Sequence, residues 1–141
     1  MAIRVEIKIE FRDKKLKTTA LVNTGFETPN PQLLLPVKAA QELNLWPDLP
    51  REASIDTYDT AGGPMRVYIV PNAGKVSILD RESESCSPDI VISHTEVEVL
   101  ISDKLASQLK IVIEDPGEGI WRFRDESPGT FRKSKPPKYF T

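Results

Sequence analysis

The tripeptide Asn23-Thr24-Gly25 places a carboxamide, a hydroxyl and a glycine directly after the apolar residues 20–22. The Asn23 carboxamide can donate and accept hydrogen bonds, so it can bind a water molecule or a carbonyl group. It lacks the basic oxygen of a carboxylate and cannot take a proton from water. The tripeptide therefore indicates a hydrogen-bonding site in a tight loop, with no general base at position 23.

A second set of candidate residues is His94, Glu96 and Glu98, which alternate along a predicted strand and would share one face. An imidazole and two carboxylates are possible ligands for a divalent metal. Alternating charges are also typical of the solvent face of a strand, and a single strand lacks the convergent ligands that a metal site needs. We favour the solvated face and expect neither a metal nor another cofactor.

The elements that must position these residues are mostly strands. Apolar and charged residues alternate over residues 3–11, which predicts a strand with one buried face. A turn at 13–15 leads to a second β-rich run, 16–22, which ends at Asn23. Further short strands are expected at 76–79, 89–93, 97–101, 111–113 and 120–123.

A hairpin and two short helices complete the expected elements. Residues 55–70 predict a hairpin whose tip holds Gly62 and Gly63, because glycine supplies the positive φ that tight turns need. Pro36 suits the start of a helix, and Ser102 is typical of the residue that caps a second one. Many short strands with one or two helices indicate a mainly β fold, a small closed or folded-over barrel.

Length and composition limit the class of protein. The chain has 141 residues, 39% hydrophobic and 28% charged, and a net charge of −2, as expected for one globular domain. The charge does not favour nucleic acid or a membrane surface as a partner, and no apolar run is long enough to span a bilayer. The lone Cys86, beside acidic residues, predicts an exposed, inert thiol with a raised pKa. We expect a cytoplasmic protein, because the start of the chain shows no apolar signal core.

Four ordered segments resemble the retropepsin-like family of single-lobed aspartic proteases, in the version found as small free-standing archaeal and bacterial proteins. They correspond to the catalytic loop, the short helix after it, the glycine-rich tip of the flap hairpin, and a strand that crosses behind the loop and enters a helix. The segments are Leu21-Val22-Asn23-Thr24-Gly25-Phe26-Glu27, Leu34-Leu35-Pro36 with Ala39, Ala40 and Leu43, Thr60-Ala61-Gly62-Gly63-Pro64, and Val99-Leu100-Ile101-Ser102-Asp103-Lys104-Leu105.

This resemblance implies a retropepsin-like acid-protease β-barrel with one or two short helices over residues 1–126. It also implies a homodimer that cuts polypeptides in a cleft between subunits, without metal or organic cofactor. By resemblance, the catalytic loop contains Asn23, Thr24 and Gly25. The substrate-binding residues are Phe26 and Glu27, together with the flap residues Thr60, Ala61, Gly62 and Gly63.

The chain departs from the family at the position that matters most. The family has aspartate where this chain has Asn23, so we expect an endopeptidase scaffold that is inactive or severely impaired. The alternative is a natural, non-catalytic module that binds peptides in the same dimer cleft, and a weaker one is a scaffold that uses only the dimer and the tail. Ser102 stands where glycine is common, which we interpret as a helix cap. Asp59-Thr60-Ala61 loosely fits the catalytic pattern, but a turn at the flap tip explains it better.

Residues 127–141 differ in composition from the rest of the chain. They contain Arg132, Lys133, Lys135 and Lys138, no acidic residue, and paired prolines. This composition predicts a flexible, solvated C-terminal tail. Two other readings stay open, in which the tail docks on an acidic partner or lies across the flaps of its own dimer as an inhibitor.

Overall fold

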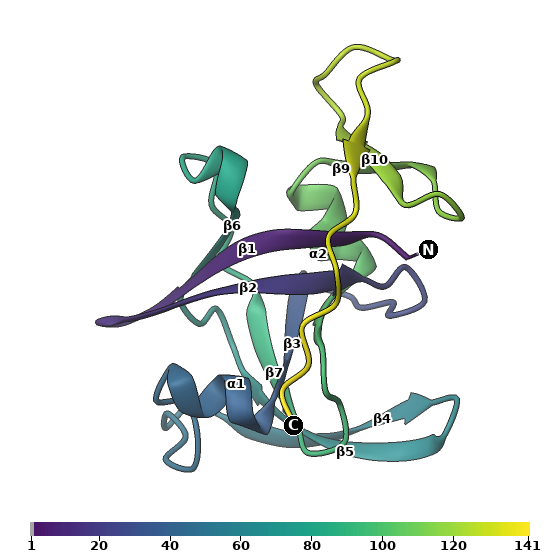
Figure 1. Ribbon diagram of the computed structural model, residues 1–141. Helices are drawn as coiled ribbons and strands as arrows, with labels where there is room; N and C mark the ends of the chain where they lie inside the picture. The colour runs from purple at the N-terminus through teal and green to yellow at the C-terminus, as the bar shows by residue number, and fades with distance from the viewer. Residues whose placement is uncertain (1) are drawn as a thin grey trace.

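Eight strands form one mixed sheet and three form a second, smaller sheet in the computed structural model, which describes residues 2–141 (Figure 1). The fold is mainly β, with two short α-helices and one 3₁₀ turn, η1, in the described residues. The elements are β1 Arg4–Phe11, β2 Lys14–Val22, β3 Gln32–Pro36, α1 Val37–Glu42, β4 Ser54–Thr60, β5 Gly63–Val70, β6 Lys75–Ile78, η1 Leu79–Arg81, β7 Asp89–Ser93, β8 Val99–Ile101, α2 Asp103–Gln108, β9 Ile111–Asp115, β10 Ile120–Phe123 and β11 Arg132–Lys133.

The large sheet has the strand order β4-β5-β7-β3-β8-β2-β1-β6. The pairs β2–β8 and β3–β7 are parallel, and the other neighbours are antiparallel. Its edges, β4 and β6, do not pair with each other within residues 2–141. No helix in that range is long and apolar enough to cross a membrane.

The predicted first hairpin is confirmed. In β1 the apolar positions of the alternation are buried, with Ile7 and Ile9 fully enclosed, and the charged positions between them are more exposed. Strand β2 pairs antiparallel with β1 over the whole length of β1. The turn is tighter than the sequence suggests, because Arg12 adopts a positive φ of 55° and β2 already begins at Lys14.

Strand β3 was not predicted, although it lies near the centre of the sheet. All five of its residues are buried, and it pairs with β7 on one side and β8 on the other. A strand buried on both faces reads as a continuous apolar run instead of an alternation, so its sequence has no period of two. The run of leucines between Pro31 and Pro36 therefore gave no sequence signal for this central strand.

Both predicted helices are present. Pro36 precedes α1, which buries Ala39 and Ala40, whereas Val37 is only half-buried. Ser102 caps α2, since its hydroxyl oxygen accepts a hydrogen bond from the backbone N–H of Leu105 at 3.2 Å.

The predicted strand at 97–101 begins only at Val99, and the placement of His94, Glu96 and Glu98 on one strand face is wrong. These three residues lie in the loop between β7 and β8. The reason is local: the Ser93 hydroxyl accepts hydrogen bonds from the backbone N–H groups of Thr95 and Glu96 at 3.2 and 3.4 Å, which turns the chain out of the sheet.

The C-terminal residues continue the fold beyond residue 126. Strand β11 pairs with β10 in the small sheet, so the compositional boundary at 126 does not coincide with the edge of a sheet. The segment after β11 runs past β1 towards α1 (Figure 1). It is held there by hydrogen bonds from Lys135 N–H to the Arg4 carbonyl, from Phe140 N–H to the Val97 carbonyl and from Lys38 Nζ to the Thr141 carbonyl. Its flexibility remains a prediction.

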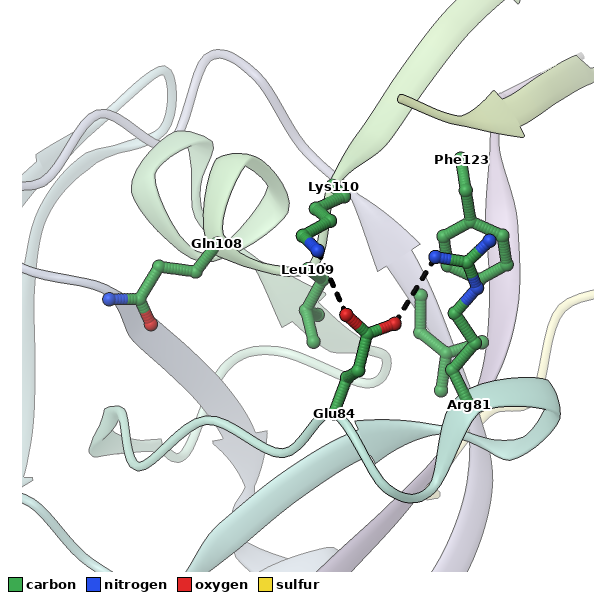
Figure 2. A pocket seen from close by; sticks show the side chains of 7 residues that line it. Arg81, Glu84, Gln108, Leu109, Lys110 and Phe123 are labelled. Carbon is green, nitrogen blue, oxygen red and sulfur yellow. Dashed lines mark hydrogen bonds and ion pairs between the residues drawn. The ribbon is translucent and has the colours of Figure 1, made fainter. Parts of the chain in front are cut away.

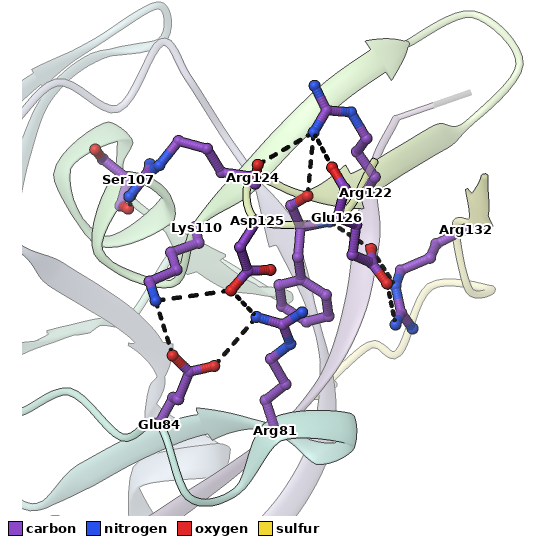
Figure 3. Close-up of polar contacts among 10 residues, drawn as sticks. Arg81, Glu84, Ser107, Lys110, Arg122, Arg124, Asp125, Glu126 and Arg132 are labelled. Carbon is purple, nitrogen blue, oxygen red and sulfur yellow. Dashed lines mark hydrogen bonds and ion pairs between the residues drawn. The ribbon is translucent and has the colours of Figure 1, made fainter. Parts of the chain in front are cut away.

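An ionic network joins the small sheet to the segment after β6. The Arg81 guanidinium lies over the Phe123 ring, 3.8 Å from its centroid, and binds the Glu84 carboxylate at 3.2 Å (Figure 2). Lys110 binds the other oxygen of Glu84 at 2.8 Å, and Asp125 accepts from Arg81 at 2.6 Å (Figure 3). The hollow that Figure 2 shows is thus occupied by paired charges, and we assign it a structural role.

Glu126 anchors the other side of this network and makes stability depend on pH. Its carboxylate binds the Arg132 guanidinium at 2.8 Å and accepts the Phe123 backbone N–H at 2.9 Å, which together lower its pKa from 4.5 to about 2. Because the folded-state pKa is the lower one, this stabilisation is fully present above pH 4.5 and is lost as the pH falls through about 2.

We therefore expect Glu126→Gln to lower the free energy of unfolding by about 1–2 kcal/mol at neutral pH, and by progressively less as the pH approaches 2. Urea unfolding at a series of pH values measures this. Glu118→Gln, at an exposed side chain in the β9–β10 turn, is the matched control. If Glu126→Gln lowered the free energy of unfolding by the same amount down to the lowest pH, the lowered pKa of Glu126 would be contradicted.

Candidate functional site

The Asn23 loop begins where β2 leaves the sheet. The Asn23 backbone N–H donates to the Ile101 carbonyl on β8 at 3.0 Å, so the start of the loop is fixed to the neighbouring strand. The Gly25 N–H donates to the carboxamide oxygen of Asn23 at 3.1 Å, and the Phe26 N–H donates to the Asn23 carbonyl at 3.0 Å. The side chain of Asn23 thus closes its own turn, a role that short polar side chains often have.

Gly25 permits this close turn. A Cβ atom at this position would lie 3.3 Å from the Asn23 carboxamide oxygen, which is tighter than ordinary packing allows. An aspartate has the shape of asparagine, and one of its oxygens would accept the same bond from Gly25. The loop geometry is therefore compatible with either residue at position 23.

The segment after the loop is tied to the start of α2. The Asp103 carboxylate accepts from the backbone N–H groups of Thr28 and Lys104 at 3.1 and 2.7 Å, and the Asp103 N–H donates to the Phe26 carbonyl at 3.0 Å. Ser102 is fully buried and its hydroxyl also accepts the Gln32 N–H, at 3.0 Å. The interpretation of Ser102 as a cap is confirmed, and its second bond fixes the entry into β3.

Replacing Ser102 tests this arrangement. We expect Ser102→Ala to destabilise the protein by about 1–3 kcal/mol, because the N–H groups of Gln32 and Leu105 lose their acceptor inside the fold. The midpoint of urea unfolding measures the loss. Ser107→Ala, at an exposed position of the same helix, should change it little, and an equal effect of both substitutions would contradict the role of Ser102.

The predicted hairpin at 55–70 is confirmed, because β4 and β5 pair antiparallel from Ser54–Ile69 to Thr60–Gly63. At its tip the Thr60 hydroxyl donates to the Gly63 carbonyl at 2.7 Å and accepts the Gly62 N–H at 3.2 Å. Gly63 has a φ of +107°, which other residues rarely adopt. Strand β4 is an edge of the sheet, and its residues are exposed except for the half-buried Tyr58.

The Asn23 loop and this hairpin meet at a groove of about 480 Å³. The predicted site residues Gly25, Phe26 and Glu27 line the groove from one side, and residues 56–59 of β4 line it from the other. Thr28, Pro29, Gln32, Ile69 and Asp89 complete the lining.

The other predicted site residues are placed elsewhere. Asn23 and Thr24 are not part of the groove wall, and Ala61 at the hairpin tip is exposed. Thr60, Gly62 and Gly63 line a separate depression on the hairpin with His94 and Thr95. The geometry thus separates the hairpin tip from the groove within one chain.

Gln32, Asp56, Tyr58 and Asp89 line the groove and were not predicted as site residues. A signal for two of them existed, because Asp56 and Tyr58 are two residues apart in a strand and so share a face. No local pattern marked Gln32 or Asp89, which reach the groove through the order of strands in the sheet.

Tyr58 connects the hairpin to the rest of the groove. Its ring lies 6.3 Å from that of Phe26, centroid to centroid, and its hydroxyl donates to the Gln32 carboxamide oxygen at 2.8 Å. Burial raises the pKa of Tyr58, the nearby carboxylates of Asp56 and Asp89 raise it further, and the hydrogen bond to Gln32 opposes this shift. The hydroxyl therefore stays protonated and holds the hairpin against β3.

No protein-family model matches this chain, and no significant match was found among curated proteins.

The remaining sequence candidates have other surroundings. His94 packs edge-on against Trp46 at 4.9 Å between ring centroids, and Glu98 binds the Arg4 guanidinium at 2.7 Å. Within residues 2–141 no three His, Cys, Asp or Glu side chains are grouped as a metal site would require. The pKa of Cys86 is raised as predicted, first by burial and then by Glu84, but the thiol is half-buried instead of exposed.

Proposed function

We propose that this chain is a retropepsin-like aspartic endopeptidase scaffold that binds polypeptides as a homodimer, and that Asn23 leaves it inactive or severely impaired as a protease. The observation that carries this proposal is the groove between the Asn23 loop and the β4–β5 hairpin. An extended peptide fits a groove that is bounded on one side by an edge strand and on the other by a glycine-containing loop.

In the proposed dimer the large sheet belongs to a folded-over, retropepsin-like barrel, and the loops of two copies meet at a two-fold axis. The two hairpins then cover a shared cleft, which would bring the exposed tip residues Thr60 to Gly63 of each copy over the peptide. A symmetric contact of this kind uses the same surface of both copies. We place this dimer in a reducing cytoplasm, because Cys86 has no second cysteine to pair with.

The chemistry of the two Asn23 side chains in the proposed dimer explains the expected loss of protease activity. A protease of this kind needs one carboxylate to take a proton from the attacking water and another to donate a proton to the scissile carbonyl. Two Asn23 carboxamides can bind the water or the carbonyl by hydrogen bonds but can transfer no proton. Peptides would therefore bind and then dissociate without being cleaved.

A second candidate function is a natural polypeptide-binding module that has no catalytic role. The groove lining favours it, since it does not include Asn23 or Thr24 and so offers a binding surface that does not depend on the residue at position 23. The two candidates share the cleft and differ in whether the rest of the machinery can still support cleavage once a carboxylate is returned.

The dimer and the cleft are tested together by sedimentation velocity and fluorescence anisotropy with a mixed library of labelled octapeptides. We expect a dimer that binds peptides without cutting them, as verified by mass spectrometry of the recovered library. A monomer that binds no peptide at the highest soluble concentration would contradict the proposal.

A further inference from the structure

The groove between the Asn23 loop and β4 carries a concentrated negative charge. Four of its twelve lining residues are acidic, and none is a lysine, arginine or histidine. Glu27 comes from the loop, Asp56 and Asp59 from the hairpin, and Asp89 from the start of β7. Negative charge therefore faces the groove from several elements.

None of these carboxylates has a cationic partner in an ion pair within residues 2–141. Asp56 accepts the Thr57 N–H at 2.7 Å, and Asp89 accepts the Asn72 N–H at 2.9 Å. These backbone bonds orient the carboxylates without neutralising them. A low-dielectric wall strengthens such a field and attracts ligands of opposite charge.

Gln32 gives an independent indication of the ligand. It is 4% exposed and lines the groove, and its carboxamide oxygen is occupied by the Tyr58 hydroxyl. Its amino group donates no hydrogen bond to any residue of 2–141 and, unlike Thr18 Oγ1 and Trp121 Nε1, is not fully enclosed, so it is open to the groove. The backbone carbonyl of a bound peptide is an acceptor that would satisfy it.

The arrangement of the charges distinguishes a peptide from a single metal ion. The acidic side chains come from the loop, the hairpin and β7, and they do not converge as three or more metal ligands within the part of the chain that the structure describes. The half-buried rings of Phe26 and Tyr58 line the same groove and offer apolar surface. The methylene stems of lysine and arginine pack on such surface while their charged ends reach acidic groups.

We propose that the groove selects polypeptide segments that carry lysine or arginine. This inference rests on the proposed polypeptide binding and adds the class of ligand to it. Glu27, Asp56, Asp59 and Asp89 bind the cationic side chains, and Gln32 binds a backbone carbonyl of the same segment.

The test uses three fluorescein-labelled octapeptides of one apolar sequence, which carry two lysines, two glutamines or two glutamates at the same positions. Fluorescence anisotropy at low salt should give a dissociation constant about tenfold lower for the lysine peptide than for the glutamine peptide. The glutamate peptide should bind more weakly than either. The preference should shrink at high salt, because screening weakens exposed charge pairs.

The double variant Asp56→Asn, Asp59→Asn should lose most of the lysine preference, measured as the ratio of the dissociation constants of the glutamine and lysine peptides. The matched control is Asp13→Asn, Glu118→Gln, which removes two exposed charges outside the groove lining and should keep the preference. Equal binding of the lysine and glutamine peptides by the unaltered chain, or a preference that survives in the first variant, would overturn this inference and leave polypeptide binding intact. Failure of all three peptides to bind would overturn both.

Discussion

Asn23→Asp is expected to convert a chain that binds peptides into one that cuts them. The carboxylate would keep the hydrogen bond from Gly25 that now closes the loop at 3.1 Å, so the substitution needs no rearrangement. In the proposed dimer two such carboxylates lie too close for both to ionise, and they share one proton. One takes a proton from water and the other donates to the scissile carbonyl, which typically accelerates such reactions about 10²–10⁴-fold.

The activity should have a bell-shaped dependence on pH, because cleavage requires one protonated and one ionised carboxylate. Mass spectrometry of a mixed peptide library, incubated from acid to neutral pH with each protein, measures it. Asn30→Asp is the control, since it adds an exposed carboxylate in the same long loop without placing it at position 23. An aspartic-protease inhibitor should stop the cleavage.

Absence of cleavage by Asn23→Asp, in a protein that stays folded and dimeric, would contradict the protease scaffold. It would favour the second candidate, the natural peptide-binding module. Cleavage by the unaltered chain or by Asn30→Asp would contradict the role assigned to residue 23.

Gly74→Ala is expected to have the largest effect on stability. Gly74 lies in the turn between β5 and β6 with a φ of +71°, where its backbone passes the Glu10 carbonyl of β1. A methyl group there would overlap that carbonyl oxygen and lie 3.1 Å from its carbon atom. Neither backbone can yield easily, because β1 and β6 pair directly beside this point, at Glu10 and Lys75.

We expect Gly74→Ala to lower the free energy of unfolding by about 3 kcal/mol or more, or to prevent folding. Urea unfolding followed by circular dichroism measures the difference. Gly62→Ala is the matched control, because the added methyl would meet only the Thr60 hydroxyl, at 3.8 Å, and should cost little. Equal stability of the two variants would show that β6 does not pack against β1 in this way.

The elements that the sequence predicts well are those whose signal is local. The alternation of β1 follows directly from one buried and one exposed face, and the glycines at positions 62 and 63 mark the hairpin tip. The sequence did not predict strand β3, and it wrongly predicted that His94, Glu96 and Glu98 share a strand face, for opposite reasons. The first has no alternation because both faces are buried, and the second has an alternation that the Ser93 hydroxyl interrupts.

The candidate site also has one part that the sequence predicts and one part that it does not. The Asn23 loop could be recognised from three residues, since its turn is closed by bonds among neighbours. The groove could not, because Gln32 and Asp89 are brought beside Tyr58 only by the strand order β4-β5-β7-β3. Long-range strand pairing of this kind has no counterpart in the spacing of residues along the chain. The acidic character of the groove is likewise not visible in the sequence, because Glu27 and Asp56 line the same groove only in the folded chain.

The measurement that tests the central claim most directly is a ¹⁵N–¹H amide spectrum of the chain, titrated with the lysine octapeptide. Binding between the Asn23 loop and the β4–β5 hairpin predicts shifts that saturate together at Gly25, Phe26 and Tyr58 from the groove and at Gly62 from the hairpin tip, with the small sheet unchanged. Shifts confined to the small sheet or to the segment after β11, or none at saturating peptide, would contradict it.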